Sequence, residues 1–269
     1  MEWLKYIPSK SVDMCYIDPP FFSNKNYEIL WGNGYELRSF GDRWKGGVKS
    51  YIVWMEERVK EIHRILKDTG SIFLHCDWHA SHRLRVMLDD VFGEKNFVNE
   101  IIWFYKTGGA SKRFFARKHD SIFFYSKNDK YKYHPTKEKS YMLHKYGFKK
   151  SDFKIDKSNG LQYTHVYSRD VWEIPSVGSA TSERIGYKTQ KPEKLIERIL
   201  KCSTNENDLI LDCFGGGGTT AAVAAKLGRR FITGDVSPVA TRVIAKRLNS
   251  LDTPPIFRVE CSQDQRGMA

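Results

Sequence analysis

The sequence predicts an α/β fold with a Rossmann-like, circularly permuted and mostly parallel sheet that carries helices on both faces. Two observations in the 269-residue chain predict it. Apolar runs that stop at polar or turn residues alternate with stretches of helical periodicity, which is the pattern of strands joined by helical crossovers. A glycine-rich turn of the nucleotide-binding type lies near the C-terminus, and only about fifty residues follow it. The other strands must therefore precede this turn, so the usual first unit comes last.

The first predicted strand, residues 11–18, runs into Asp18-Pro19-Pro20-Phe21. An apolar run closed by a proline pair indicates a buried strand that stops abruptly. Pro20 holds Pro19 in an extended conformation, so the Pro19 carbonyl is free to accept a hydrogen bond. A carboxylate, this carbonyl and the Phe21 ring could together hold a planar base that bears an amino group. A simple strand-ending turn is the alternative interpretation of these residues taken alone.

A second buried strand is predicted at residues 208–214, followed by the glycine-rich turn 215–220 and an alanine-rich helix. Glycines at such a turn let a ligand approach the backbone, and the helix N-terminus presents free N–H groups. The next strand ends in Asp235, about twenty residues on, where an acid can bind a ribose hydroxyl. The spacing also fits a nicotinamide dehydrogenase. The late position of the turn in the chain disfavours that alternative.

The remaining elements follow from periodicity. Residues 51–67 place apolar side chains at steps of three and four, as an amphipathic helix does. Residues 22–50 are rich in glycine and asparagine, which favours a mobile lid or a plain connecting loop. Further strands are predicted at 71–77, 99–103 and 121–126, and further helices after Gln190 and at 238–248.

The order of these motifs resembles that of a beta-class DNA amino-methyltransferase, in which the catalytic motif precedes the S-adenosylmethionine motif. The family's first motif commonly ends in Tyr, whereas Phe21 keeps the ring without the hydroxyl. The matching stretches cover most of the chain: 18–21, 51–67 with 70–77, 118–125, 189–192 and 212–220.

The resemblance implies an S-adenosylmethionine-dependent methyltransferase fold. It also implies direct transfer of a methyl group to the N6 amino group of a flipped-out adenine in double-stranded DNA, which leaves S-adenosyl-L-homocysteine. Asp18, Pro19, Pro20 and Phe21 would form the catalytic motif. The residues expected to bind the cofactor are Asp18, Gln190, Lys191, Pro192, Asp212, Phe214, Gly215, Gly216, Gly218, Thr219 and Asp235.

The sequence leaves alternatives for the base that is methylated. Aspartate at the first motif position resembles adenine-N6 enzymes, while cytosine-N4 enzymes more often carry serine there. A cytosine-N4 DNA methyltransferase, an RNA adenine-N6 methyltransferase and a non-enzymatic nucleic-acid-binding module are the alternatives. A binding module would not need both Asp18 in a catalytic motif and Asp235 beside a cofactor loop, so their joint presence disfavours it.

Charge indicates a nucleic-acid partner. The chain has a net charge of +12, and residues 105–169 hold sixteen Lys and Arg against five Asp and Glu, interleaved with aromatic residues. This composition suits phosphate contacts combined with base or sugar packing. We expect one catalytic domain, 1–269, in which 105–185 is an inserted target-recognition region. The candidate DNA contacts are Lys106, Lys112, Arg113, Arg117, Lys145 and Lys149.

The cysteines favour reduced core residues and a cytoplasmic location. None follows a proline, as the nucleophile of a cytosine-C5 methyltransferase would, and no Cys/His spacing indicates a metal. The chain lacks an apolar run long enough for a membrane span and the pattern of a signal peptide. A homodimer and a cognate restriction enzyme are expected partners by resemblance. The five cysteines are Cys15, Cys76, Cys202, Cys213 and Cys261.

Two further expectations concern the ends of the chain and the strand edge. In the resembled family a strand that contributes to the adenine pocket precedes the first helix, whereas residues 1–4 of this chain are expected to lie already inside that helix. Residues 256–260 are predicted to supply this strand, with Cys261 and Ser262 near the adenine. An N-terminally truncated enzyme with a disordered tail is the alternative. His75 and Asp77 are expected beside Asp18, where they would order water, line the pocket or contact DNA.

Overall fold

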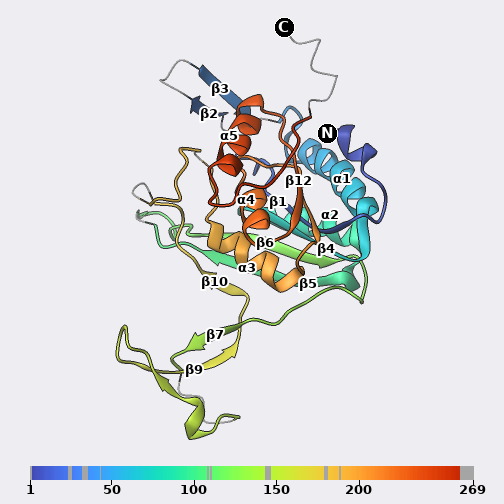
Figure 1. Cartoon of the computed structure of the whole chain (residues 1–269). Coiled ribbons are helices and arrows are strands. Elements are labelled where there is room, and N and C mark those ends of the chain that lie inside the picture. Colours follow the sequence, from blue (N-terminus) through green and yellow to red (C-terminus); the bar gives the residue numbers. More distant parts are fainter. Residues whose placement is uncertain are drawn as a thin grey trace.

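The computed structural model describes residues 2–23, 26–31, 36–42, 44–107, 109, 111–142, 147–178, 181–187 and 189–260. A seven-stranded sheet with helices on both faces forms the body, and a smaller three-stranded sheet projects from it (Figure 1). Among the described residues, no helix is both long and apolar enough to span a bilayer.

The large sheet has the strand order β10-β5-β6-β4-β1-β11-β12. β6 is antiparallel to both β4 and β5, and the other pairings are parallel. The predicted permuted, mostly parallel α/β sheet is therefore confirmed. The bounds are β1 Val12–Ile17, β4 Leu66–Cys76, β5 Phe97–Phe104, β6 His119–Ser126, β10 Val171–Glu173, β11 Leu209–Asp212 and β12 Arg230–Thr233.

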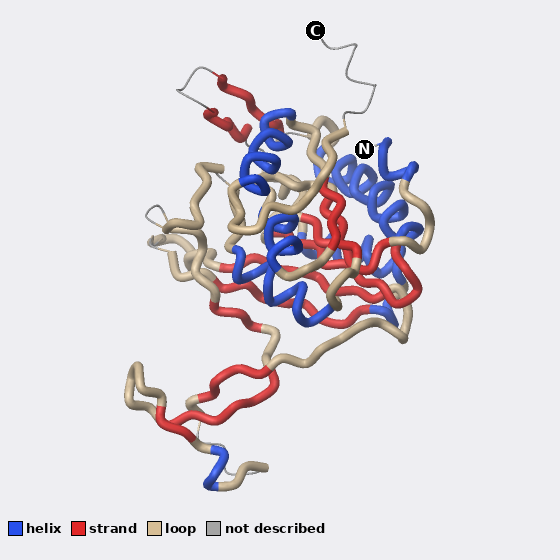
Figure 2. The backbone as a smooth tube through the Cα atoms, in the orientation of Figure 1, coloured by secondary structure: helices blue, strands red, loops and turns tan. Residues whose placement is uncertain are grey.

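Helices cover the sheet on both faces (Figure 2). α1 (Gly47–Ile65) and α2 (Ser81–Phe92) share one buried apolar cluster with one face of β1, β4 and β11. α3 (Glu193–Ser203) and α4 (Thr219–Lys226) share another with the opposite face, and α5 (Pro238–Asn249) packs against α4. Full burial of each large apolar side chain stabilises the fold by roughly 1.5–3 kcal/mol.

α1 shows how the sequence pattern becomes packing. Tyr51, Met55, Val59 and Ile62 are fully buried, and their spacing of three and four places them on one face of the helix. The helix starts earlier than predicted and ends at Ile65. The chain becomes extended immediately afterwards because Leu66 already pairs with Val12 of β1 as the first residue of β4.

The parallel strands end at one edge of the sheet, here called the carboxyl edge. The opposite edge, where they begin, is the amino edge. β1 lies between β4, which follows it in the chain, and β11, which comes from the C-terminal part. The connections from β1 and from β11 therefore run toward opposite sides of the sheet. Open α/β sheets bind ligands in the crevice at the carboxyl edge where the direction of the connections reverses.

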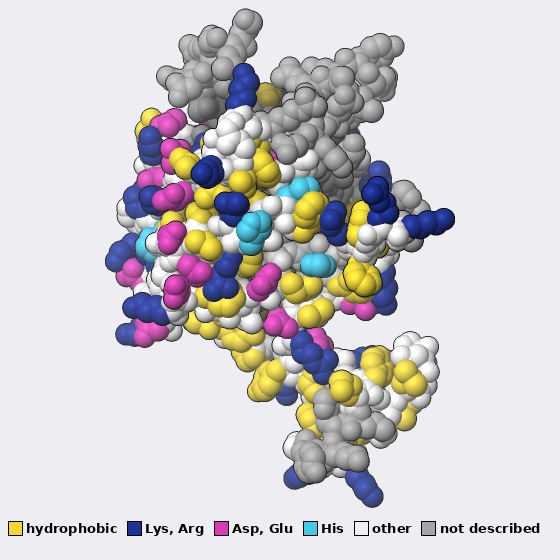
Figure 3. Space-filling model, turned by 180° about the vertical axis from the view of Figure 1, so that it is seen from behind, with side chains coloured by type: hydrophobic (Ala, Val, Ile, Leu, Met, Phe, Trp, Pro, Cys, Tyr) yellow, Lys and Arg dark blue, Asp and Glu magenta, His cyan; other side chains and the backbone are white. Residues whose placement is uncertain are grey.

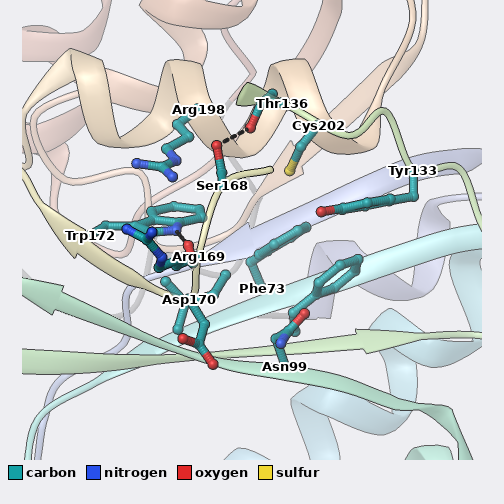
Figure 4. Close-up of a pocket in the computed structure, with 12 residues that line it drawn as sticks. Phe73, Asn99, Tyr133, Thr136, Ser168, Arg169, Asp170, Trp172, Arg198 and Cys202 are labelled. Carbon is teal, nitrogen blue, oxygen red and sulfur yellow. Dashed lines mark hydrogen bonds between the residues drawn. The ribbon is translucent and has the colours of Figure 1, made fainter. Parts of the chain in front are cut away.

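The projecting sheet, which we call the lobe, consists of β7 (Lys137–Ser140), β9 (Gln162–Tyr167) and β8 (Lys154–Ile155) in the order β7-β9-β8. It follows β6 and precedes β10, so the chain enters and leaves it at the amino edge. The Ser168 N–H donates to the Thr136 carbonyl at 2.9 Å, and the Thr136 hydroxyl donates to Ser168 Oγ at 2.9 Å (Figure 4). These bonds close a narrow neck.

A hairpin, β2 (Asn26–Trp31) and β3 (Glu36–Gly41), lies within the segment predicted to be a lid. Its base is tied down by the buried Asp42, whose carboxylate accepts hydrogen bonds from Phe22 N at 3.0 Å and Trp44 Nε1 at 3.1 Å. The hairpin therefore starts from a fixed point beside the first motif. Its closure as a lid stays a prediction.

Short 3-10 helices complete the described elements. They are Glu2–Tyr6, Glu94–Asn96 and Lys150–Asp152.

The prediction of a strand at residues 256–260 is wrong. Residues 256–260 form no strand, and Ile256 is fully exposed. The two prolines just before them, Pro254 and Pro255, lack the N–H groups that a ladder needs. Residues 2–6 form a 3-10 helix whose Trp3 packs against Gly234, just beyond β12. Cys261 and Ser262 lie outside the described residues.

Candidate functional site

Asp18 lies at the carboxyl end of β1 with one oxygen paired and one open. Lys191 Nζ, just before α3, donates to Asp18 Oδ2 at 2.5 Å, and both side chains are largely buried. The same ammonium is 5.2 Å from the centre of the Phe21 ring. Asp18 Oδ1 is buried and has no hydrogen-bond partner among the described residues. The site thus combines an open acceptor with an aromatic ring.

A buried polar chain lies behind Asp18. The Tyr16 hydroxyl is 2.8 Å from Nδ1 of the fully buried His75, and His75 Nε2 is 3.1 Å from Asp120 Oδ2. The Tyr105 hydroxyl donates to Asp120 Oδ1 at 3.1 Å. His75 Nδ1 is 3.9 Å from Asp18 Oδ1. The prediction placed His75 at this edge but missed Tyr16, Tyr105 and Asp120.

The hydrogen bonds and charges around Asp120 in this buried polar chain favour its ionised form. Burial raises the pKa of Asp120, but the hydrogen bond from His75, the nearby Lys191 and the hydrogen bond from Tyr105 outweigh burial, so its pKa is below the usual value. Because a carboxylate only accepts, His75 Nε2 carries the proton in this bond. In the neutral ring Nδ1 then accepts from the Tyr16 hydroxyl.

The glycine turn after β11 has the backbone geometry that the sequence predicts. Gly216 and Gly218 have φ values of +48° and +72°, a region that L side chains rarely adopt. A Cβ atom on Gly218 would lie 3.0 Å from Ile244 Cγ1 of α5, so the turn packs closely. α4 begins directly after it and presents its N-terminal amides at the carboxyl edge.

Two acids frame this turn. Asp235, after β12, accepts from Gly216 N at 2.9 Å and from Ser237 N at 2.8 Å, and burial raises its pKa. Asp212, at the end of β11, accepts from Phe214 N at 3.0 Å. Burial raises the pKa of Asp212 to about 7. The fold therefore buries the Asp212 carboxyl group and partly buries that of Asp235 beside the turn.

Buried Arg247 of α5 links the turn to the start of α3. It donates to the Gly217 carbonyl and to Thr219 Oγ1, each at 3.0 Å, and to Glu193 Oε1 at 2.9 Å. The Thr219 hydroxyl donates in turn to the Lys191 carbonyl at 3.1 Å. The site prediction missed Arg247, which from sequence looks like one more charge on a surface helix.

The other two predicted residues of this segment have roles within the chain. The Gln190 side chain accepts from Ile185 N at 3.0 Å and donates to the Glu183 carbonyl at 2.7 Å, so it closes the preceding loop. Pro192 is the N-cap residue of α3.

These residues fit a cofactor that has nucleoside and amino-acid parts. The turn leaves no room for a side chain at Gly215, because a Cβ atom there would collide with Thr233 Oγ1. Glycine therefore keeps the backbone of the turn accessible to a ligand. Thr233 Oγ1 and Asp18 Oδ1 are buried polar atoms without hydrogen-bond partners in the described part of the chain. They lie at the ends of β12 and β1, on either side of the turn.

Four of the predicted DNA contacts lie between or beside β5 and β6 at the carboxyl edge. Lys112, Arg113 and Arg117 are exposed, and Lys106 pairs with Glu173 at 2.6 Å. Lys149 is exposed in the lobe, and Lys145 lies outside the described residues.

An exposed mixed surface surrounds Arg117. Its guanidinium lies 3.8 Å from the centre of the Trp78 ring and 4.7 Å from that of Phe114. Phe115 is 98% exposed. Lysine and arginine side chains also stand among hydrophobic ones on the side of the body above the lobe (Figure 3).

A pocket of about 370 Å³ lies elsewhere, at the root of the lobe (Figure 4). Asn99 at the start of β5, Asp170 before β10 and Cys202 near the end of α3 line it, which places it toward the amino edge. It is therefore separate from the Asp18 site.

Comparison with known proteins gives a consistent result. A family model for N6 and N4 methyltransferases, described as DNA methylase, matches residues 12–246. The chain is 29% identical over 248 residues to the DNA adenine methyltransferase YhdJ of Escherichia coli K12, covering 91% of this chain and 79% of that protein. It is 30% identical to the type II methyltransferase M.HinfI of Haemophilus influenzae, with coverage of 95% and 68%.

Solved structures agree on the fold. The PvuII DNA methyltransferase, described as cytosine-N4-specific, superposes with a TM-score of 0.62 at 18% identity and covers 94% of this chain and 84% of its own. The complex of M1.HpyAVI with S-adenosylmethionine gives 0.55 at 18% identity, with coverage of 92% and 93%.

Proposed function

The chain belongs to the N6/N4 DNA methylase family, and on that basis we propose that it methylates the N6 amino group of adenine in double-stranded DNA. Its methyl donor is S-adenosylmethionine, which supplies an electrophilic methyl group. The observation that carries the proposal is the open Oδ1 of Asp18 beside the Phe21 ring, one strand away from the glycine turn.

Adenine is favoured by the acidic first residue of the motif and by the similarity to an adenine methyltransferase. Cytosine N4 is the second candidate, because a solved structure with the same fold is described as cytosine-N4-specific. Both bases present an exocyclic amino group, so the same acceptors serve either reaction.

The chain's own residues act mainly by positioning. Asp18 Oδ1 and the Pro19 carbonyl accept the two amino hydrogens, which directs the nitrogen lone pair out of the ring plane. Phe21 stacks on the flipped base, worth roughly 1–3 kcal/mol. Lys191 holds the other Asp18 oxygen and so fixes the carboxylate. Positioning and electrostatics of this kind supply the rate enhancement without a covalent enzyme intermediate.

The cofactor residues divide by chemistry. Asp235 takes a ribose hydroxyl, and the glycine turn with the α4 N-terminus lies against the nucleoside. Asp212 faces the cationic part, because a nearby cation favours the ionised form of a carboxyl whose pKa burial has raised. Lys191 can contact the cofactor carboxylate while it keeps Asp18, since an ammonium has three donors.

DNA contacts come from two places. Lys112, Arg113 and Arg117 would contact phosphates next to the flipped base, because their loop lies at the carboxyl edge. The lobe, with Lys149, would contact DNA farther away and act as the core of the target-recognition region. We also propose a homodimer and a cognate restriction enzyme as partners. Similarity to a protein described as a type II methyltransferase supports the second of these.

The test is methyl transfer from labelled S-adenosylmethionine to duplex DNA and, separately, to RNA, followed by digestion and nucleoside analysis. N6-methyladenine in DNA is expected, and N4-methylcytosine would select the second candidate. Label in RNA alone, in 5-methylcytosine or nowhere would overturn the proposal. Asp18→Ala should abolish transfer while calorimetry still detects cofactor binding.

A further inference from the structure

His75 is buried directly behind the proposed acceptor, and the mechanism above leaves it unused. Its ring packs against Phe21 with centroids 5.6 Å apart and against Trp103 at 5.4 Å. Its Nδ1 faces the open oxygen of Asp18 at 3.9 Å. Asp120 holds the opposite ring nitrogen at 3.1 Å. The imidazole is therefore oriented by one carboxylate and directed at another.

The proposed reaction has a proton to dispose of. When the amino nitrogen forms its bond to the methyl group, the nitrogen becomes positively charged and must lose one hydrogen as a proton. The nearest acceptor is Asp18 Oδ1, since Lys191 already occupies Oδ2. A carboxylic acid left there would no longer accept from the next base, so Asp18 must be deprotonated again.

We propose that His75 is a positioning residue that receives this proton from Asp18, a role that rests on the proposed function. The N–H bond of the methylated amine breaks and an O–H bond forms at Asp18 Oδ1. That O–H bond then breaks as Nδ1 of His75 gains the proton. Tyr16 changes from donor to acceptor at Nδ1, and Asp120 stabilises the imidazolium from the other side.

The surroundings of His75 suit this role better than a purely structural one. A structural histidine needs only the two hydrogen bonds from Tyr16 and to Asp120, and its approach to Asp18 and Phe21 would then have no consequence. The titratable or charged groups that face His75 or its partner Asp120 are Tyr16 of β1, Asp18 directly after β1, Asp77 after β4, Tyr105 after β5, Asp120 of β6 and Lys191 before α3.

His75→Gln separates the two roles. A glutamine amide can donate to Asp120 and accept from Tyr16, but it cannot take up a proton. We expect the steady-state rate of methyl transfer to fall about 100-fold, because Asp18 then keeps the proton after the first turnover. The dissociation constants for cofactor and DNA should change by less than about twofold, since neither ligand touches the ring nitrogens. The loss of rate at acidic pH caused by His75 should also disappear.

Controls keep the result interpretable. His63→Gln changes a half-buried histidine at the far end of α1, packed on Phe92, and should leave the rate unchanged. Asp120→Asn should slow transfer and provides a second route if His75→Gln does not fold. A wild-type rate in either folded site variant, or an unchanged acid limb in His75→Gln, would overturn the inference.

One readout needs neither DNA nor cofactor. In ¹⁵N-histidine NMR spectra of the protein alone, Asp18→Asn should shift the Nδ1 resonance of His75, because the substitution removes the carboxylate oxygen that faces Nδ1 at 3.9 Å. An unchanged resonance would overturn the coupling. If the wild-type protein methylates no nucleic acid, the proposed function fails, and this experiment still reports separately on the His75–Asp18 pair.

Discussion

Asp212→Asn should make the folded protein more stable at pH 8 than the wild type. Burial moves the pKa of Asp212 from 3.8 to about 7, a little over three units. Between these values the folded state holds a proton that the unfolded chain has lost, so stability falls as the pH rises and levels off above pH 7. At about 1.4 kcal/mol per unit, the ionised carboxyl destabilises the fold by about 4 kcal/mol.

Urea unfolding at pH 5 and pH 8, without cofactor, measures this effect. Roughly two of the three units lie in that interval, so the stability difference between variant and wild type should increase by about 3 kcal/mol from pH 5 to pH 8. Contributions of other groups cancel in this comparison. Asp129→Asn, at an exposed position, is the matched control.

A change below about 0.5 kcal/mol would refute the raised pKa, since that is the usual range of surface substitutions. The gain in stability should be accompanied by weaker cofactor binding in calorimetry. Retained affinity would refute the placement of Asp212 against the cation of the cofactor.

Three further predictions concern packing and charge. Gly218→Ala should lower the unfolding free energy by about 1–2 kcal/mol, because alanine is strained at φ +72°; an unchanged urea midpoint would contradict this. Gly234→Ala should destabilise the fold because its Cβ would lie 2.5 Å from the Trp3 ring, and a double-mutant cycle with Trp3→Ala should recover about 1–3 kcal/mol. Additive effects would show that the contact does not matter. Arg117→Ala should reduce the salt slope of DNA binding by about 1, as for one lost phosphate contact, whereas Lys60→Ala on α1 should leave the slope measured by fluorescence anisotropy unchanged.

Much of the fold could be predicted because the central strands of its sheet are buried on both faces. β1 and β11 are short apolar runs that end at turn residues, and burial of such runs leaves little choice of structure. α1 could be predicted from its period. α2 was missed although Leu84 and Leu88 show the same spacing, because its mixture of charged residues masks the pattern.

The site could be predicted only where a residue's role depends on its own segment. Asp18 follows its own strand, so its place at the edge is local information. The polar chain behind it joins residues from three strands, and Asp120 is near His75 only because β6 pairs antiparallel with β4. The failed prediction at 256–260 has the same origin: an apolar alternation does not by itself provide a partner strand.

The neck of the lobe has a consequence for how such a gene can change. Since Thr136 and Ser168 are hydrogen-bonded to each other, everything between them begins and ends at one spot on the body. A segment with adjoining ends can be exchanged, shortened or lengthened as a block without shifting the register of β6 or β10. Recombination at two sites would then replace this block while the chemistry at Asp18 is inherited intact.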